Sequence, residues 1–98
     1  MQEVKIWLDD IRSAPTGYHL CKSVNDTKRY IIDCENQNIK IVELDLDHDL
    51  GDYANDGGDA IKLVLWLIET ERFYNVRLHT ANPVGRENMQ ALIDRYWR

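Results

Sequence analysis

The sequence predicts a three-layer α/β domain around a mainly parallel four-stranded sheet. Short apolar runs typical of buried strands alternate with longer segments of helical period, and residues that favour turns separate them. Polar side chains follow three of the four predicted strands, which is where open parallel sheets bind ligands. At 98 residues, the chain is expected to form a single domain over residues 1–98 with a modest core.

The first half of the predicted order is strand, loop, strand and helix. Val4–Leu8 alternates in the manner of a strand, and residues 11–17 contain Pro and Gly without a helical period, which predicts a loop. Residues 18–22 predict a weak second strand. A helix is expected to begin at Ser23, with Asp26 completing an imperfect capping box, and to end near residues 36–38.

The second half contains the strand that we take as the centre of the domain, over residues 39–46, followed by a loop over residues 51–58. The next segment, from Gly58, is apolar on most faces, which predicts a helix buried against the sheet. A last strand is expected over residues 76–80, and Gly85 is expected to open a closing helix. The sequence given ends before a fifth strand, so we expect a sheet of four.

The central strand ends in three alternating aspartates and a histidine. Crowded carboxylates repel one another and resist leaving water, so such a cluster is expected where a cation or a proton is shared. Asp47, His48 and Asp49 follow the strand directly, whereas Asp45 lies further from its end and is placed outside the site. This stretch predicts the floor of an active site.

The formal net charge is −5, from 12 basic and 17 acidic residues, and five aspartates at the predicted strand ends account for it. Without those five, 12 acids would balance 12 bases, so the acidity is local. A basic face for duplex DNA is therefore not expected, and an anionic substrate would need a metal ion to approach the cluster.

We expect a cytoplasmic protein. No apolar run approaches the ~20 residues of a membrane helix, and the short run at Val4–Leu8 ends in two aspartates, unlike a signal peptide. Cys21 and Cys34 stand singly, which favours reduced thiols.

Three groups of polar residues are expected to meet at one edge, because the carboxyl ends of parallel strands lie together. The groups are Asp9 and Asp10, then Asp47, His48 and Asp49, and then His79, Thr80 and Asn82.

Three motifs in this order resemble a divergent branch of the response-regulator receivers, the cyclic-phosphate-processing receiver-like family. Its motifs LDDxR, LDHDLG and H-[ST]-A-N-P-x-G-R stand here as Leu8–Arg12, Leu46–Gly51 and His79–Arg86. The resemblance covers nearly the whole chain. It implies a small receiver-like, flavodoxin-like fold and metal-dependent processing of cyclic phosphates in nucleotides or RNA ends. In receivers, the acidic pair and the central aspartate hold Mg²⁺, and that aspartate accepts a phosphoryl group.

For the metal, Asp9, Asp10 and Asp47 offer the hard oxygen ligands that Mg²⁺ and Mn²⁺ prefer. Turn and cap aspartates are the alternative for any one of them, but three at adjacent strand ends favour a metal site.

For catalysis, we assign roles to Asp47, His48, Asp49 and His79. An unperturbed imidazole titrates near neutrality, at a pKa of about 6.5, so His48 and His79 are expected to move protons while Asp49 orients a histidine or the water. Binding of a transition metal by the histidines with Asp49 is the alternative.

For the phosphate, Arg12 and Arg86 are expected to clamp its oxygens, because a guanidinium matches them in a bidentate way. Thr80, Asn82 and Gly85 are expected to complete the substrate site at the start of the last helix. Surface arginines that balance nearby acids are the alternative.

Three functions remain open: a metal-dependent phosphoesterase, a receiver-like signalling or protein-binding module, and a protein that sequesters a nucleotide. A protein partner or a second copy of the chain would bind through the open sheet edge.

Overall fold

A computed structural model describes residues 2–97. The sheet consists of four strands: β1 (Glu3–Leu8), β2 (Tyr18–Cys21), β3 (Lys40–Leu46) and β4 (Val76–Leu78). The helices are α1 (Val24–Asn36), α2 (Ala60–Glu69) and α3 (Pro83–Tyr96), with the short 3-10 helix η1 (Gly51–Asn55) before α2. None of the helices in this part of the chain has the length and apolar character needed to cross a membrane.

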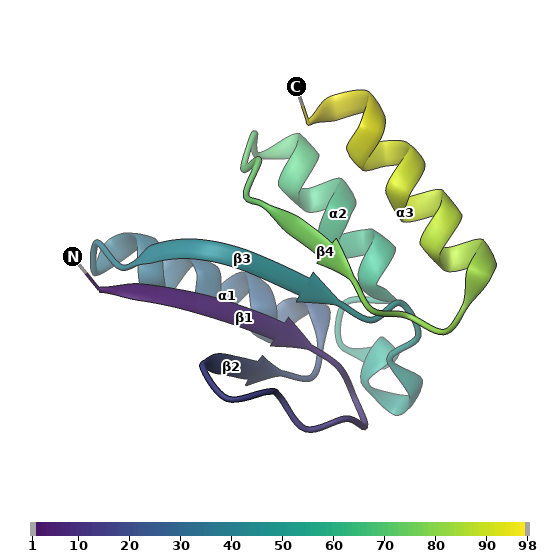
Figure 1. The fold of residues 1–98 in the computed structure, drawn as a ribbon, viewed down its shortest axis with the longest axis horizontal. Coiled ribbons are helices and arrows are strands. Elements are labelled where there is room, and N and C mark those ends of the chain that lie inside the picture. The colour runs from purple at the N-terminus through teal and green to yellow at the C-terminus, as the bar shows by residue number, and fades with distance from the viewer. Residues whose placement is uncertain (1, 98) are drawn as a thin grey trace.

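The strands form one sheet in the order β2-β1-β3-β4, and every neighbouring pair is parallel (Figure 1). This confirms the α/β class, the parallel sheet and the predicted order of elements. The connection from β1 to β2 is a loop without a helix, as its Pro and Gly predict. Because all four strands point the same way, their carboxyl ends share one edge of the sheet.

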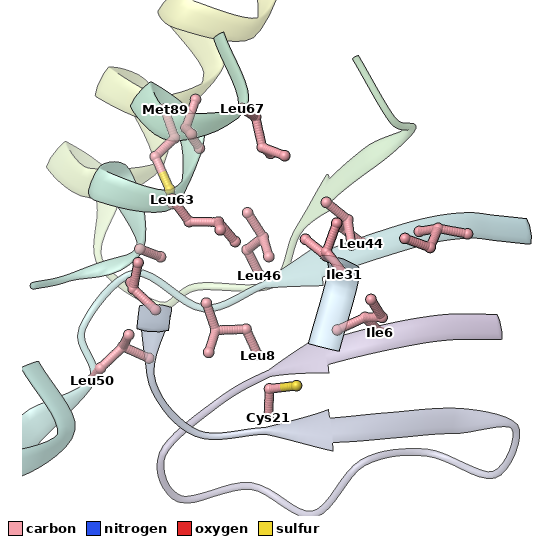
Figure 2. Close-up of a cluster of buried hydrophobic side chains, with 14 of the residues drawn as sticks. Ile6, Leu8, Cys21, Ile31, Leu44, Leu46, Leu50, Leu63, Leu67 and Met89 are labelled. Carbon is pink, nitrogen blue, oxygen red and sulfur yellow. The ribbon is translucent and has the colours of Figure 1, made fainter. Parts of the chain in front are cut away.

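One face of the sheet carries the hydrophobic core (Figure 2). Ile6 and Leu8 of β1 are fully buried on this face, and all three helices contribute buried side chains to the same cluster, such as Ile31, Leu63 and Met89. Alternation along the strands puts every second side chain on this face. The three helices therefore cover a single face of the sheet.

The opposite face is mostly polar and aromatic. Several of its polar side chains pair with one another, although the buried Nε1 of Trp7 has no hydrogen-bond partner in residues 2–97. Trp7 is paired in register with Asp45, the hydroxyl of Tyr18 donates a hydrogen bond to Glu43, and an Arg77 nitrogen lies 3.7 Å from the Glu43 carboxylate. The apolar side chains on this face, Trp7 and Leu20, are half-buried among these neighbours, and no helix of residues 2–97 covers the face. The prediction of three layers is wrong for residues 2–97, which form two.

Side-chain caps mark the starts of two of the helices, α1 and α3. Ser23 caps α1 by accepting a hydrogen bond from the backbone N–H of Asp26 at 3.1 Å, as predicted. The last helix begins at Pro83, two residues before the predicted start, because Asn82 caps it by accepting from the backbone N–H of Gly85 at 3.0 Å. Pro is well suited to the first position of a helix, where its missing N–H costs nothing.

Candidate active site

A cavity of about 360 Å³ opens at the carboxyl edge of the sheet, where β1, β3 and β4 end. Its lining includes acidic, basic and amide side chains from all three strand ends. The lining residues are Asp9, Asp10, Ile11, Arg12, Asp47, Asp49, Gly51, Thr80, Ala81 and Asn82. The three groups of polar residues predicted from the sequence therefore do meet at one edge.

Asp9 is the most enclosed carboxylate of the cavity, at 1% exposure. Its Oδ1 accepts hydrogen bonds from the backbone N–H groups of Ile11 and Arg12, both at 2.9 Å, and its Oδ2 faces Arg12 and His79. Burial raises the pKa of Asp9, but these hydrogen bonds outweigh it and hold the pKa below its usual range. Asp9 is therefore a fixed negative charge.

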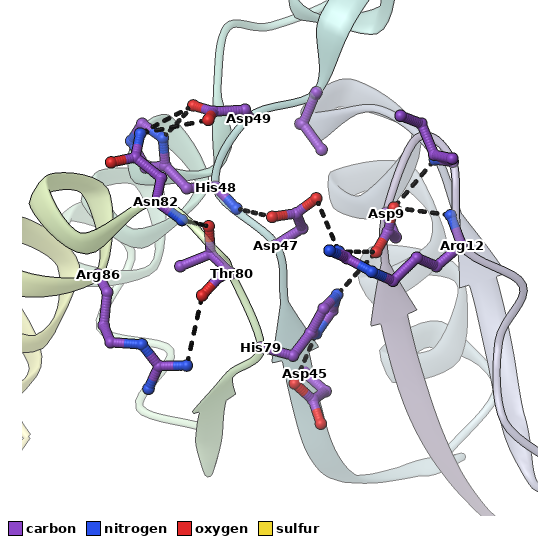
Figure 3. A network of polar contacts seen from close by, with 12 residues as sticks. Asp9, Arg12, Asp45, Asp47, His48, Asp49, His79, Thr80, Asn82 and Arg86 are labelled. Atoms are coloured by element: carbon purple, nitrogen blue, oxygen red, sulfur yellow. Dashed lines mark hydrogen bonds and ion pairs between the residues drawn. The ribbon is translucent and has the colours of Figure 1, made fainter.

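Asp47 faces Asp9 across the end of the sheet and is 8% exposed. Its Oδ1 accepts from the backbone N–H of His48 at 2.8 Å. The guanidinium of Arg12 lies between the two acids, with Nη1 3.1 Å from Asp9 Oδ2 and 3.5 Å from Asp47 Oδ2 (Figure 3). The pKa of this guanidinium is raised, first by its hydrogen bond to Asp9.

Asp10 lines the cavity from the side of Gly51. The Gly51 backbone has a φ of +55°, and a Cβ built there would lie 2.7 Å from Asp10 Oδ2. Glycine avoids both the cost of this left-handed conformation and the contact with the Asp10 carboxylate. The glycine of the LDHDLG motif thus makes room for the second acid of the LDD motif.

Among residues 2–97, two groups of acidic and imidazole side chains are close enough to hold a metal ion. In each group, one ligand atom per residue lies within 4.8 Å of the others. The groups are Asp9, Asp47 and His79, and His48, Asp49 and Asp59. The first contains two of the three predicted metal ligands, with His79 in place of Asp10.

His79 lies beneath the cavity and outside its lining. Its Nε2 is 2.9 Å from Asp9 Oδ2, its Nδ1 is 2.8 Å from Asp45 Oδ1, and its ring stacks on Trp7 with the centroids 3.8 Å apart. Both nitrogens face carboxylates, which only accept, so both hydrogen bonds form when the ring carries both protons. The geometry is that of a support for Asp9 and not of a free proton carrier.

Asp45 is the residue that sequence reasoning left out. A signal for it exists: Asp45 pairs in register with Arg77, so His79, two residues further on, lies on the same face of the sheet as Asp45. An aspartate and a histidine offset in this way on neighbouring strands are within reach of each other.

His48 lies on the other side of the cavity, against α3. Its Nδ1 is 2.8 Å from Asp49 Oδ1, and the amide of Asn82 donates to both oxygens of Asp49 at 3.2 Å. These hydrogen bonds, first that of His48, lower the pKa of Asp49. Asp49 therefore lines the cavity, whereas His48 lies behind it and contacts the cavity only through Asp49.

The predicted phosphate ligands divide into two sets. Arg12, Thr80 and Asn82 line the cavity, whereas Gly85 and Arg86 lie outside its lining. A Cβ on Gly85 would lie 2.5 Å from Cγ of His48, so this glycine permits the close approach of α3.

Arg86 donates hydrogen bonds to the backbone carbonyl oxygens of Leu78 and Thr80, at 3.1 and 3.5 Å. Figure 3 shows it beyond Thr80, away from Asp9. In this arrangement Arg86 ties the start of α3 to the end of β4.

The comparisons with known proteins agree with the motifs. No curated protein and no solved structure matches the chain. Residues 4–95 match the family model described as cyclic-phosphate processing receiver domain. The match covers most of the chain, which therefore belongs to the family of cyclic-phosphate processing receiver domains.

Proposed function

We propose that this protein is a metal-dependent phosphoesterase that processes a cyclic or terminal phosphate on a nucleotide or RNA end. The observation that carries the proposal is one cavity in which the buried carboxylates Asp9 and Asp47 lie beside the guanidinium of Arg12 and the amide of Asn82. Acids that hold a cation, together with donors for phosphate oxygens, are the two elements that metal-assisted phosphoryl chemistry needs.

The donor set fits Mg²⁺ or Mn²⁺, because Asp9, Asp10 and Asp47 all supply hard oxygen atoms to the same cavity. A bound ion would neutralise charge on the phosphate and make a water molecule more acidic.

The side chains of the protein then bind the phosphate, orient the water and move protons. Arg12, Thr80 and Asn82 hold the phosphate oxygens, and Arg12 supplies up to two parallel donors. Asp49, kept ionised by its hydrogen bonds, accepts from and orients the attacking water, and His48 behind it carries a proton. His79 acts through Asp9, whose position it fixes.

In the proposed reaction, the water oxygen bonds to phosphorus while one ring P–O ester bond breaks. The leaving oxygen takes up a proton, and the product is a phosphomonoester. Partial positive charge from Arg12 offsets the charge that accumulates on the phosphoryl oxygens.

The direct test is a screen of cyclic nucleotides and of RNA ends bearing a 2′,3′-cyclic phosphate, with Mg²⁺ or Mn²⁺ and with a chelator. Metal-dependent release of a phosphomonoester by the wild type, absent in Asp47→Asn, supports the proposal. Tight binding without turnover would instead indicate that the protein sequesters its ligand.

A receiver-like signalling role is the second candidate, favoured by the place of Asp47 at the end of β3 beside Asp9 and Asp10. In that role Asp47 accepts a phosphoryl group. Incubation with a small phosphoryl donor and Mg²⁺, followed by intact mass measurement, separates the two: a stable single-phosphate adduct favours signalling.

A cytoplasmic setting and a partner at the sheet edge belong to the same proposal. The edge strands β2 and β4 are short, and each lacks a strand partner on one side, where a second copy or another protein could bind; on β4, Arg86 of α3 already occupies the outward carbonyl of Leu78. Size-exclusion chromatography with light scattering tests for the second copy.

A further inference from the structure

The guanidinium of Arg12 occupies the space between the two most buried acids of the cavity. A single nitrogen, Nη1, is 3.1 Å from Asp9 Oδ2 and 3.5 Å from Asp47 Oδ2. Asp9 and Asp47 also belong to the group whose ligand atoms lie within 4.8 Å of one another. The positive charge of Arg12 and a divalent cation therefore need the same two carboxylates.

Two such carboxylates need a positive charge nearby. Asp9 and Asp47 are 1% and 8% exposed, so water screens their repulsion poorly. Arg12 supplies positive charge to both acids from within the chain, and His79 contacts only Asp9 of the two. It neutralises part of the acidic pair without any ion.

The anchor of Arg12 is separate from its charged end. Its backbone N–H donates to Asp9 Oδ1 at 2.9 Å, while its side chain is 51% exposed. Rotation of the side chain can move the guanidinium out of the pair while the backbone stays fixed. His79, 2.9 Å from Asp9 Oδ2, still holds the Asp9 carboxylate when the guanidinium leaves.

We propose that Arg12 is an internal counter-ion that competes with the divalent cation for Asp9 and Asp47 and, once displaced, binds the phosphate of the ligand. The inference rests on the metal-dependent function proposed above. In this role, Arg12 weakens the affinity for the metal and strengthens the affinity for the phosphate.

This double role sets an order of binding. A doubly charged ion outcompetes one guanidinium for two carboxylates, and the released guanidinium lies in a cavity that it already lines. There its fork of N–H donors matches phosphate oxygens. Metal entry thus prepares the site for an anion, first by reducing the negative charge of the cavity and then by freeing a donor.

The first test measures Mn²⁺ binding by calorimetry in the wild type, Arg12→Gln, Arg12→Lys and Arg29→Gln. Arg29 is a matched control, since it also pairs with two aspartates, Asp26 and Asp56, but lies outside the cavity lining. The expected result is roughly tenfold tighter Mn²⁺ binding in Arg12→Gln, the order of one competing charge removed from a partly buried pair. Arg29→Gln, with the same change in net charge, and Arg12→Lys should stay close to the wild type.

The second test measures binding of inorganic phosphate at saturating Mg²⁺ by the same proteins. Here Arg12→Gln should bind roughly tenfold more weakly than the wild type, because a charge-assisted pair is lost. Arg12→Lys should also be weaker, since an ammonium lacks the planar fork. Opposite signs for metal and phosphate are the signature of the counter-ion role.

Two results would overturn the inference and differ from each other. If the wild type binds Mn²⁺ and Arg12→Gln binds it equally or more weakly, Arg12 does not compete and the metal centre survives. If none of the proteins binds Mn²⁺ or Mg²⁺, the metal centre fails and the inference falls with it. Thermal unfolding of each variant confirms that binding is compared between folded proteins.

Discussion

Two carboxylate–histidine pairs of the described residues flank the cavity. Their imidazoles are similarly buried, at 14% and 15% exposure, but their carboxylates differ sharply. Asp9 and His79 form the buried pair: the Asp9 side chain is 0% exposed and receives hydrogen bonds from two backbone amides, a guanidinium and an imidazole. Asp49 and His48 form the exposed pair: the Asp49 side chain is 63% exposed and receives hydrogen bonds from one imidazole and one amide.

This difference indicates that the buried pair supports the site, whereas the exposed pair is available to act on a ligand. The buried pair has partners on both sides, with Asp45 and Trp7 behind His79, so neither group is free to move toward a ligand. The exposed pair has solvent and the cavity on one side, so Asp49 can turn toward a ligand at little cost. Losing one member of a buried charged pair is costly, whereas an exposed pair contributes little to stability.

We expect the largest effect from Asp47→Asn. Asp47 lies between the two carboxylate–histidine pairs. The substitution removes a charge from the metal site but preserves shape, so Mn²⁺ binding and turnover should fall by roughly a thousandfold or more. The free energy of unfolding should change by less than about 1 kcal/mol, because an amide oxygen can still accept from the His48 N–H. Calorimetry, an activity assay and urea unfolding check this, with Asp49→Asn as the control that should keep its metal affinity. Full activity of Asp47→Asn would refute the assignment.

The next effect contrasts the two histidines directly. His79→Ala should lower the free energy of unfolding by about 2–4 kcal/mol, since it removes two hydrogen bonds to carboxylates and a stacked ring and leaves Asp9 buried. His48→Ala should cost less, about 1 kcal/mol, because the carboxylate that hydrogen-bonds its ring, that of Asp49, is mostly exposed. Urea unfolding of both variants measures the difference. Equal losses would mean that the two pairs are not distinct in the way described.

A third test sharpens the account of the exposed pair. Gly85→Ala places a Cβ 2.5 Å from Cγ of His48, and the overlap should cost about 1–3 kcal/mol of stability. The double variant Gly85→Ala/His48→Ala removes the ring that causes the overlap, so most of that loss should be recovered. A double-mutant cycle by urea unfolding measures the coupling. Additive losses would show that Gly85 is needed for another reason.

The sequence was sufficient for the parts of the molecule that depend on local pattern. Alternating apolar residues fixed the strands, Ser23 marked the start of α1, and parallel pairing made the three strand ends converge. For this reason Asp9 and Asp47 could be placed together before their geometry was known. Each lies directly after a buried strand, so its direction follows from the strand itself.

The directions of the two imidazoles could not be predicted, because tertiary contacts set them. His79 is drawn beneath the cavity by Trp7 of β1 and Asp45 of β3, and His48 is held against α3 by the close approach at Gly85. The number of layers was mispredicted for a related reason. An apolar pattern identifies the covered face of a sheet, but whether the other face is covered depends on tertiary contacts that the pattern does not contain.

The smallest effect concerns the acid limb, which is the fall in the free energy of unfolding as the pH is lowered. The two pairs should differ in how steep this fall is. The pKa of Asp9 lies below its ordinary value of 3.8 in the folded protein, so the carboxylate adds stability that is fully present above that value and is lost as the pH falls through the lower folded value. Asp9→Asn removes this contribution, and its free energy of unfolding should fall less steeply than that of the wild type below about pH 4. The pKa of Asp49 is also lowered, by His48 and Asn82, but its side chain is mostly exposed, so Asp49→Asn should flatten the acid limb less. Urea unfolding of the three proteins from about pH 6 to pH 3 measures the slopes. A steeper limb in Asp9→Asn, or a larger flattening in Asp49→Asn, would reverse the assignment of the buried and exposed pairs.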